Sequence, residues 1–411
     1  MNAEIISVGT ELLLGNIVNT NAQYLSKRLA ELGHFVYRQT TVGDNAERLA
    51  QVLKEALERT TLIVMTGGLG PTQDDLTKET VAKLFNRKLL LDEVSLKRIR
   101  ERTGEIELSD ANKKQAYIPE GAILLPNDVG TAPGCILEDR GKIIVLLPGP
   151  PVEMENMFER YAAQHLKHYS EGVLVSRILR IFGLRESQLA GILKDFFERY
   201  ENPTVAPYAS DGEVTVRITA RATDKKQAEK MIAPVAEEII KRLGDHIYAE
   251  GKTSLEEVVI EMLKKAHLSI ATAESCTGGL MASKLINVPG ASEVFKEGII
   301  AYSNEAKMRL LGVTSQILKT HGAVSAETAL EMAKGVATLA GSDIGVSITG
   351  IAGPGGGTPE KPVGLVYIGI WFAGRKSVKK LQLHGNRNWI RLKSALYALD
   401  TLRRVLKTQS K

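Results

Sequence analysis

The sequence contains little cysteine, few aromatic side chains and little net charge. Its 411 residues include two cysteines and two tryptophans, aromatic residues make up 5%, and the formal net charge is +5. Two cysteines as far apart as Cys135 and Cys276 provide neither a disulfide framework nor a zinc site, as expected in the reducing cytoplasm. The small net charge gives no general argument for binding to nucleic acid or to a membrane surface.

The sequence also lacks long apolar runs. A helix that spans a membrane needs about 20 consecutive apolar residues, and no run of that length is present. The first residues carry an early charge, Glu4, and lack the basic start and apolar stretch of a signal peptide. A chain of 411 residues is too long for one ordinary hydrophobic core. We therefore expect a cytoplasmic protein of two or three domains with no membrane segment.

The N-terminal part alternates between strand and helix patterns. Residues 4–8, 34–40, 62–65 and 143–147 are rich in β-forming side chains, and helix patterns lie between them. This alternation predicts a three-layer α/β domain with a mostly parallel sheet. Ligands of such sheets bind beyond the carboxyl ends of the strands, where two polar loops begin at Gly9 and Thr66.

The loop that begins at Thr66 combines glycines with two adjacent carboxylates. Its backbone N–H groups suit phosphate oxygens, and a carboxylate pair would recruit a hard divalent cation. The alternative is that Asp74 or Asp75 only caps the following helix. The combination with the loop at Gly9 favours a phosphorylated ligand and a metal ion. The predicted phosphate site comprises Gly9, Thr10, Glu11, Gly67, Gly68, Gly70 and Thr72, and the predicted metal ligands are Asp74 and Asp75.

The middle segment, residues 172–250, has a β-α-β-β-α-β order of patterns. This order predicts a small α+β domain. Basic residues are scattered among acidic ones, which favours a structural or dimerising role over direct contact with nucleic acid.

A turn near the start of the C-terminal segment places two hydroxyls and a thiol between a short strand and a helix. Ser275, Cys276 and Thr277 are followed by Gly278 and Gly279. Such a turn exposes a side chain in front of unpaired backbone N–H groups, which suits a nucleophile and a developing oxyanion. The glycines let a substrate approach the backbone. The alternative is an ordinary tight turn with capping hydroxyls.

Lys307 is the candidate general base. It lies in the first turn of a predicted helix, where the positive helix end disfavours an ammonium group, and burial would lower its proton affinity further. Its pKa would have to fall by roughly 2–3 units to serve as a base near neutral pH. The alternative is a solvated surface lysine. Cys276 is the rival nucleophile to Ser275, because thiolates form more readily than alkoxides.

Two further features predict contacts to a ligand. Thr349 ends a buried strand, and the glycine-rich loop that follows contains Gly350 and Gly353. Such a loop either wraps a ligand or is only a flexible connection. Arg387 precedes the last predicted helix and fits a phosphate or carboxylate clamp, whereas Arg391 could be structural.

Several motifs resemble the CinA family. In the N-terminal part they are Gly9-Thr-Glu-Leu-Leu-Leu-Gly-Asn, Thr66-Gly-Gly-Leu-Gly-Pro-Thr-Gln-Asp-Asp and Pro148-Gly-Pro-Pro-Val-Glu. In the C-terminal part they are Ala273-Glu-Ser-Cys-Thr-Gly-Gly, Tyr302-Ser-Asn-Glu-Ala-Lys, His321-Gly-Ala-Val-Ser, Ser347-Ile-Thr-Gly-Ile-Ala-Gly-Pro and Lys361-Pro-Val-Gly. The family usually has Gly-Asp-Arg where this chain has Gly385-Asn386-Arg387, so a carboxylate next to Arg387 is replaced by an amide.

The resemblance implies a molybdopterin-binding-like N-terminal domain (1–170) with metal-dependent pyrophosphatase activity on ADP-ribose. It implies a KH-type middle domain (171–250), although no glycine loop of the KH kind is evident at Gly183-Leu-Arg-Glu. It implies an α/β amidohydrolase domain (251–411) that needs no cofactor and converts nicotinamide mononucleotide to nicotinate mononucleotide and ammonia. A homodimer is also expected.

The same resemblance assigns roles in the amidase half. Ser275 attacks the carboxamide, and Lys307 takes its proton directly or through Tyr302. Backbone N–H groups of the turn from Cys276 to Gly279 hold the oxyanion, and the nucleotide is held by Thr349, the glycine-rich loop and Arg387. Two other functions stay open: a competence-associated binding or regulatory protein, and a molybdopterin-binding protein.

Overall fold

The computed structural model describes residues 1–105, 107–170, 172–210 and 212–409. The chain forms two compact units, Met1–Val175 with Ala220–Met231, and Ser176–Thr219 with Ile232–Lys411. In the part of the chain that is described, no helix has the length and apolar character needed to cross a bilayer.

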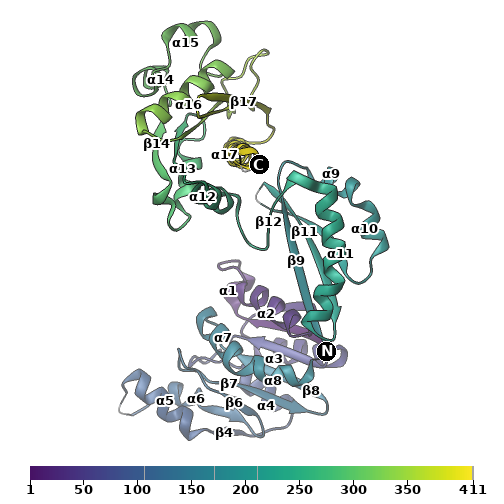
Figure 1. Cartoon of the computed structure of the whole chain (residues 1–411). Coiled ribbons are helices and arrows are strands. Elements are labelled where there is room, and N and C mark those ends of the chain that lie inside the picture. Colours follow the sequence, from purple (N-terminus) through teal and green to yellow (C-terminus); the bar gives the residue numbers. More distant parts are fainter. Residues whose placement is uncertain (106, 171, 211, 410–411) are drawn as a thin grey trace. The chain divides into compact units, whose positions relative to one another are not determined.

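The first unit is built on a six-stranded sheet with the strand order β2-β1-β3-β8-β7-β6 (Figure 1). The first four strands of this order are parallel, and β7 and β6 complete one edge in antiparallel pairing. The strands are β1 (Asn2–Val8), β2 (Phe35–Val42), β3 (Leu62–Thr66), β6 (Ile123–Leu125), β7 (Gly134–Asp139) and β8 (Lys142–Leu147), and a separate pair is formed by β4 (Leu89–Leu91) and β5 (Tyr117–Pro119).

Helices cover both faces of this sheet, which gives the three layers predicted from the sequence. Ile5 and Val64 point into one core with Leu25 of α2, and Ile6 points into the other core with Leu53 of α3. Burial on both faces explains why these strands are continuous apolar runs. The helices are α1 (Thr10–Leu13), α2 (Thr20–Glu31), α3 (Ala46–Arg59), α4 (Thr77–Leu84), α5 (Glu93–Thr103), α6 (Asp110–Lys114), α7 (Pro151–Met157), η1 (Phe158–Ala162), α8 (Ala163–Leu166) and η2 (Lys167–Tyr169).

The middle segment has the predicted β-α-β-β-α-β order, with the first helix divided in two. Its four strands form one sheet in the order β10-β11-β9-β12. The elements are β9 (Val173–Ile181), α9 (Glu186–Ile192), α10 (Lys194–Arg199), β10 (Thr204–Ser210), β11 (Glu213–Ala222), α11 (Lys225–Leu243), η3 (Gly244–His246) and β12 (Ile247–Glu250).

The C-terminal segment is an α/β domain on a five-stranded sheet, in the order β14-β13-β15-β16-β17. Strand β13, next to the edge strand β14, pairs in parallel with β14 and β15, and β16 and β17 are antiparallel. Its elements are α12 (Leu255–Ala266), β13 (Ile270–Glu274), α13 (Leu280–Ile286), η4 (Ala291–Glu293), β14 (Phe295–Ile300), α14 (Asn304–Leu311), α15 (Ser315–His321), α16 (Ala326–Ala340), β15 (Ile344–Gly350), β16 (Leu365–Phe372), β17 (Arg375–Gln382) and α17 (Arg387–Gln409).

The two faces of this second sheet pack against different helices. Ile270 of β13 lies in a core with Leu263 of α12 and Leu399 of α17, whereas Ala271 packs with Met332 of α16 on the other face. Because β13, β14 and β15 are parallel, their carboxyl ends lie at the same edge of the sheet. This edge therefore brings the turn after β13 close to the segments that follow β14 and β15.

Candidate active site

Ser275 lies on a tight turn between β13 and α13, as the sequence predicts. Its backbone N–H donates to the carbonyl of Ile348 over 2.9 Å, and its own carbonyl accepts from the N–H of Gly278 over 3.2 Å. Gly278 and Gly279 have φ values of +61° and +89°, a left-handed conformation that favours glycine. The turn therefore keeps the chain close to the sheet edge and ends where α13 begins.

Two charged side chains that the sequence analysis did not place here hold the turn. Glu274 is 1% exposed, and its carboxylate accepts the N–H groups of Met281 and Ala282 over 3.1 and 2.8 Å. Arg391 of α17 donates to the carbonyls of Cys276 and Thr277 over 3.2 and 2.8 Å. Glu274 thus occupies the start of α13, where the sequence analysis expected unpaired donors.

One N–H group of the predicted donor set is engaged within the turn itself. The N–H of Gly278 is engaged with Ser275. Within the described residues, the N–H groups of Cys276 and Thr277 donate to no protein acceptor. The Cys276 carbonyl and the Thr277 N–H belong to one peptide group, so the bond from Arg391 fixes the orientation of the Thr277 N–H. The Ser275 carbonyl shares its peptide group with the Cys276 N–H, and its bond with Gly278 fixes that second donor.

Lys307 is buried against Ser275, so the alternative of a solvated surface lysine is wrong. The side chain is 1% exposed, and its Nζ lies 3.1 Å from Ser275 Oγ, which is itself on a residue only 8% exposed. The same Nζ donates to the carbonyls of Ala301 and Tyr302 over 2.9 and 3.1 Å. The carbonyl of Glu274 accepts the N–H of Ala301 over 2.9 Å, which extends the β13–β14 pairing as far as this contact.

Burial shifts the two titratable groups of the site in opposite senses. It lowers the pKa of Lys307 from its ordinary value because the charged ammonium is desolvated. It raises the pKa of the Cys276 thiol to about 11, because the thiolate would be the desolvated charged form. At neutral pH the lysine is thus pushed towards the neutral amine and the cysteine stays a thiol, which favours Ser275 over Cys276 as the nucleophile.

Tyr302 and Arg387 lie together at the edge of the site. The side chain of Tyr302 is 64% exposed, and its hydroxyl accepts from Arg387 Nη2 over 3.4 Å. Arg387 Nη1 donates to the carbonyl of Gly353 over 2.7 Å. The backbone carbonyl of Tyr302 therefore contacts Lys307, whereas its side-chain hydroxyl contacts Arg387.

The predicted ligand loop follows the last residues of β15, Thr349 and Gly350, which are held in place by their neighbours. Thr349 is buried, and its hydroxyl donates to the carbonyl of Ala323 over 2.7 Å. Gly350 packs so closely on β16 that a Cβ there would lie 2.8 Å from the Leu365 carbonyl. Gly353 therefore lies next to Arg387, as a shared ligand site requires. The Thr349 hydroxyl is instead engaged by the protein itself.

The N-terminal site lies at the carboxyl edge of the first sheet. Gly67 has φ +102°, and a Cβ there would meet the Val8 carbonyl at 2.1 Å, so the loops after β1 and β3 touch at a position that requires glycine. In the described part of the chain, the N–H groups of Gly68, Leu69 and Gly70 have no protein acceptor. Free backbone N–H groups of this kind suit phosphate oxygens.

Two aspartates stabilise the loops of this site through hydrogen bonds to threonines. Asp75 Oδ2 accepts the N–H and the hydroxyl of Thr72 over 2.9 and 2.5 Å. Asp44, which the sequence analysis did not single out, accepts the N–H and hydroxyl of Thr10, both over 2.8 Å. Asp74 and Glu11 are exposed. The second Asp75 oxygen and Asp74 give a donor set of oxygens that fits a hard cation shared with a substrate phosphate.

Another question is whether protein side chains alone could hold a cation. Among residues 1–105, 107–170, 172–210 and 212–409, no group of three or more histidine, cysteine, aspartate or glutamate side chains forms a metal cage. A divalent ion at Asp74 and Asp75 would therefore depend on the substrate and water for its remaining ligands.

Comparisons with known proteins agree with this three-part arrangement. Residues 4–168 match the family model "Probable molybdopterin binding domain", residues 176–249 match "Damage-inducible protein CinA KH domain" and residues 252–406 match "CinA C-terminal domain". A "CinA-like protein" of Kosmotoga olearia is 60% identical over 408 residues, which is 99% of both chains. The chain belongs to the CinA family.

Other CinA relatives match over the same length or over one domain. A "CinA-like protein" of Dictyoglomus thermophilum is 58% identical, again over 99% of both chains. A solved structure of a competence/damage inducible protein from Agrobacterium tumefaciens is 41% identical, covers 37% of this chain and 93% of that chain, and has a TM-score of 0.36.

Three residues of this CinA protein support the N-terminal loops without having been predicted. Asn21 donates to the Thr66 hydroxyl over 3.0 Å and to the Gly149 carbonyl over 2.7 Å, so it joins the loops after β3 and β8. Lys114 donates to the carbonyls of Thr72 and Asp75 over 2.9 and 2.6 Å. Lys78 is buried, which lowers its pKa to about 8. Asn21 lies at the end of the polar loop that begins at Gly9, and Lys78 lies shortly after the glycine loop, so both were near predicted site segments in sequence, whereas Lys114 was not.

Proposed function

We propose that the C-terminal domain hydrolyses the carboxamide of nicotinamide mononucleotide with Ser275 as nucleophile and Lys307 as general base. The observation that carries this proposal is the set of three contacts around Lys307 Nζ. Two are to carbonyl oxygens, which only accept, and the third is to the Ser275 hydroxyl. A neutral amine has two N–H donors and one lone pair, so it satisfies both carbonyls and accepts the serine proton at the same time.

The first half of the reaction forms an acyl-enzyme. Ser275 Oγ bonds to the carboxamide carbon while its proton moves to Lys307 Nζ. The carbonyl electron pair becomes an oxyanion, which the free N–H groups of Cys276 and Thr277 stabilise. When the C–N bond breaks, the departing nitrogen takes the proton from Lys307 and leaves as ammonia.

The second half restores the enzyme. A water molecule gives a proton to Lys307 and bonds to the ester carbon. The bond between that carbon and Ser275 Oγ then breaks, and Oγ recovers the proton from Lys307. Nicotinate mononucleotide is released. Every proton passes through the same Nζ, so the reaction begins from the neutral amine, which burial favours.

The choice of a nucleotide substrate is supported by Arg387 and by membership of the CinA family. Arg387 is fixed to the Gly353 carbonyl through Nη1 and reaches Tyr302 through Nη2. Its remaining guanidinium donors are suited to a phosphate group. The Arg387 position next to the exposed Tyr302 ring gives the substrate both a cation and an aromatic surface.

Ammonia release from nicotinamide mononucleotide, assayed with and without a chelator, tests the amidase proposal. We expect release to continue in excess chelator for the wild type and to be lost in Ser275→Ala. Absence of release from the wild type, with the substrate recovered unchanged, would contradict the proposal and favour a binding or regulatory role linked to competence.

The N-terminal site supports a second proposed activity, hydrolysis of the pyrophosphate of ADP-ribose. The acceptor-free N–H groups of Gly68, Leu69 and Gly70 suit phosphate oxygens, and Asp74 and Asp75 would hold a divalent cation. Such a cation would neutralise phosphate charge in the transition state.

A chelator distinguishes the two activities in one preparation. We expect it to abolish formation of AMP and ribose 5-phosphate from ADP-ribose while ammonia release from nicotinamide mononucleotide continues. If the protein bound molybdopterin tightly and left ADP-ribose intact with divalent cations present, the third interpretation, a molybdopterin-binding protein, would replace this one.

A further inference from the structure

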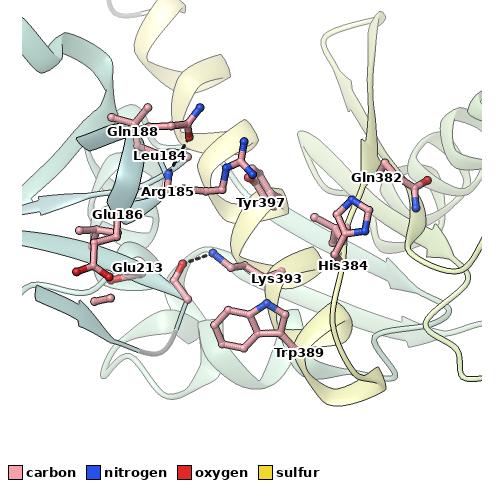
Figure 2. Close-up of a pocket in the computed structure, with 15 residues that line it drawn as sticks. Leu184, Arg185, Glu186, Gln188, Glu213, Gln382, His384, Trp389, Lys393 and Tyr397 are labelled. Carbon is pink, nitrogen blue, oxygen red and sulfur yellow. Dashed lines mark hydrogen bonds between the residues drawn. The ribbon is translucent and has the colours of Figure 1, made fainter. Parts of the chain in front are cut away.

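A cavity of about 810 Å³ lies within the second unit and is not lined by Ser275 or Lys307. One side is formed by the stretch from Gly183 to Gln188 and by the start of β11, and the other side by the loop after β17 and the first turns of α17 (Figure 2). Ligand pockets commonly enclose about 300–1,000 Å³. The cavity therefore has room for a molecule of nucleotide size.

The cavity carries positive charge that the protein leaves available. Arg185 forms no ion pair in the described part of the chain, and Figure 2 shows its guanidinium beside Tyr397. Lys393 donates to the Gly212 carbonyl over 2.5 Å, which keeps its ammonium at the wall. His384 has no hydrogen-bond partner among the described residues, so a ring N–H is available to a ligand.

The two acidic residues of the lining do not cancel this charge. Glu213 is engaged by Arg180 over 2.7 Å and by the Tyr248 hydroxyl over 2.6 Å. Glu186 points away from Arg185 and Lys393 in Figure 2. The interior of the cavity is thus suited to an anion.

Aromatic rings lie next to the cationic groups. The Trp389 side chain is 39% exposed, and its ring centroid lies 5.3 Å from Lys393 Nζ. Tyr397 is held in place by an edge contact with Phe182, with ring centroids 4.9 Å apart. An exposed indole face is a stacking surface for a nucleobase.

We propose that this cavity is a nucleotide-binding site, distinct from the amidase site. The phosphate would contact Arg185 and His384, and the base would stack on Trp389. The helix α17 separates the two sites, because Trp389 and Arg391 are two positions apart and point about 200° apart around the helix axis. Trp389 lines the cavity, whereas Arg391 binds the turn that carries Ser275.

Tryptophan fluorescence tests the site directly, because the chain has two tryptophans. In Trp371→Phe the remaining emission comes from Trp389. We expect AMP to quench it saturably in the full-length protein. Arg185→Gln and His384→Gln should each weaken binding by at least about tenfold. Arg309→Gln, which removes the same charge from an exposed position on α14, should leave it unchanged.

Partial ligands and a conservative variant complete the test. Adenosine, which lacks the phosphate, and ribose 5-phosphate, which lacks the base, should each bind at least about tenfold more weakly than AMP. Arg185→Lys should recover part of the affinity, with unchanged circular dichroism in every variant. The proposal is overturned if AMP gives no saturable quenching, if adenosine binds as tightly as AMP, or if Arg185→Gln binds as tightly as Arg309→Gln.

Discussion

Lys307 Nζ lies 3.1 Å from Ser275 Oγ, although 32 positions separate the two residues in sequence. The contact exists because β14 pairs in parallel with β13 and delivers the start of α14 next to the turn after β13. Desolvation at this place lowers the pKa of Lys307, which favours the neutral amine that the proposed mechanism needs.

Replacement of Lys307 by methionine should lower kcat/KM for ammonia release by about 10²–10⁴-fold, the usual contribution of a general base. The wild-type rate should rise with pH as the lowered pKa of Lys307 is passed, because the neutral amine is the active form. This rise should be absent in the residual activity of Lys307→Met. A matched change at an exposed lysine, Lys376→Met, should keep both the rate and the pH profile; an identical profile in Lys307→Met would contradict the assignment.

The same lysine should make the stability of the C-terminal domain depend on pH. Its pKa is lower in the folded state than in the unfolded chain, so unfolding binds a proton and folding is opposed at low pH. The unfolding free energy of the wild type should therefore increase with pH relative to that of Lys307→Met. The increase should end at about pH 10.4, the ordinary pKa of lysine. Urea unfolding followed by tryptophan fluorescence measures this, since Trp371 and Trp389 both lie in this domain. A difference that stays constant with pH would show that Lys307 is not shifted.

Glu274 should be a structural support of the nucleophile turn. Replacement by alanine leaves the N–H groups of Met281 and Ala282 without their acceptor in a buried place. We expect a loss of about 2–4 kcal/mol in unfolding free energy, measured by urea unfolding. The control is Glu293→Ala, which removes an exposed ion pair with Lys264 and should cost about 1 kcal/mol or less. Equal losses in the two variants would rule out the support role.

The sequence predicted correctly those structural features that depend on neighbouring residues in the chain. The three-layer N-terminal domain follows from alternating apolar strands and amphipathic helices, and the turn at Ser275 follows from a short strand, two glycines and a helix. Lys307 stood out because a lysine in the first turn of a helix is unfavourable unless it has a function.

Features that depend on distant packing were missed. Nothing near Arg391 in sequence indicates that α17 crosses the turn and binds the Cys276 and Thr277 carbonyls. Glu274 was read as part of a motif, yet its role depends on burial against α13. For Tyr302, the motif did not reveal that the backbone carbonyl, and not the hydroxyl, faces Lys307.

The assignment of Ser275 as the nucleophile is tested most sharply by comparing the turnover of nicotinamide mononucleotide by Ser275→Ala and Cys276→Ala. The neighbouring thiol is a matched control because it is buried on the same turn and its pKa is raised to about 11. We predict that Ser275→Ala lowers kcat by about 10⁴-fold or more and that Cys276→Ala changes it by less than about tenfold. Near-normal turnover by Ser275→Ala, together with loss of activity in Cys276→Ala, would show that Cys276, and not Ser275, is the nucleophile.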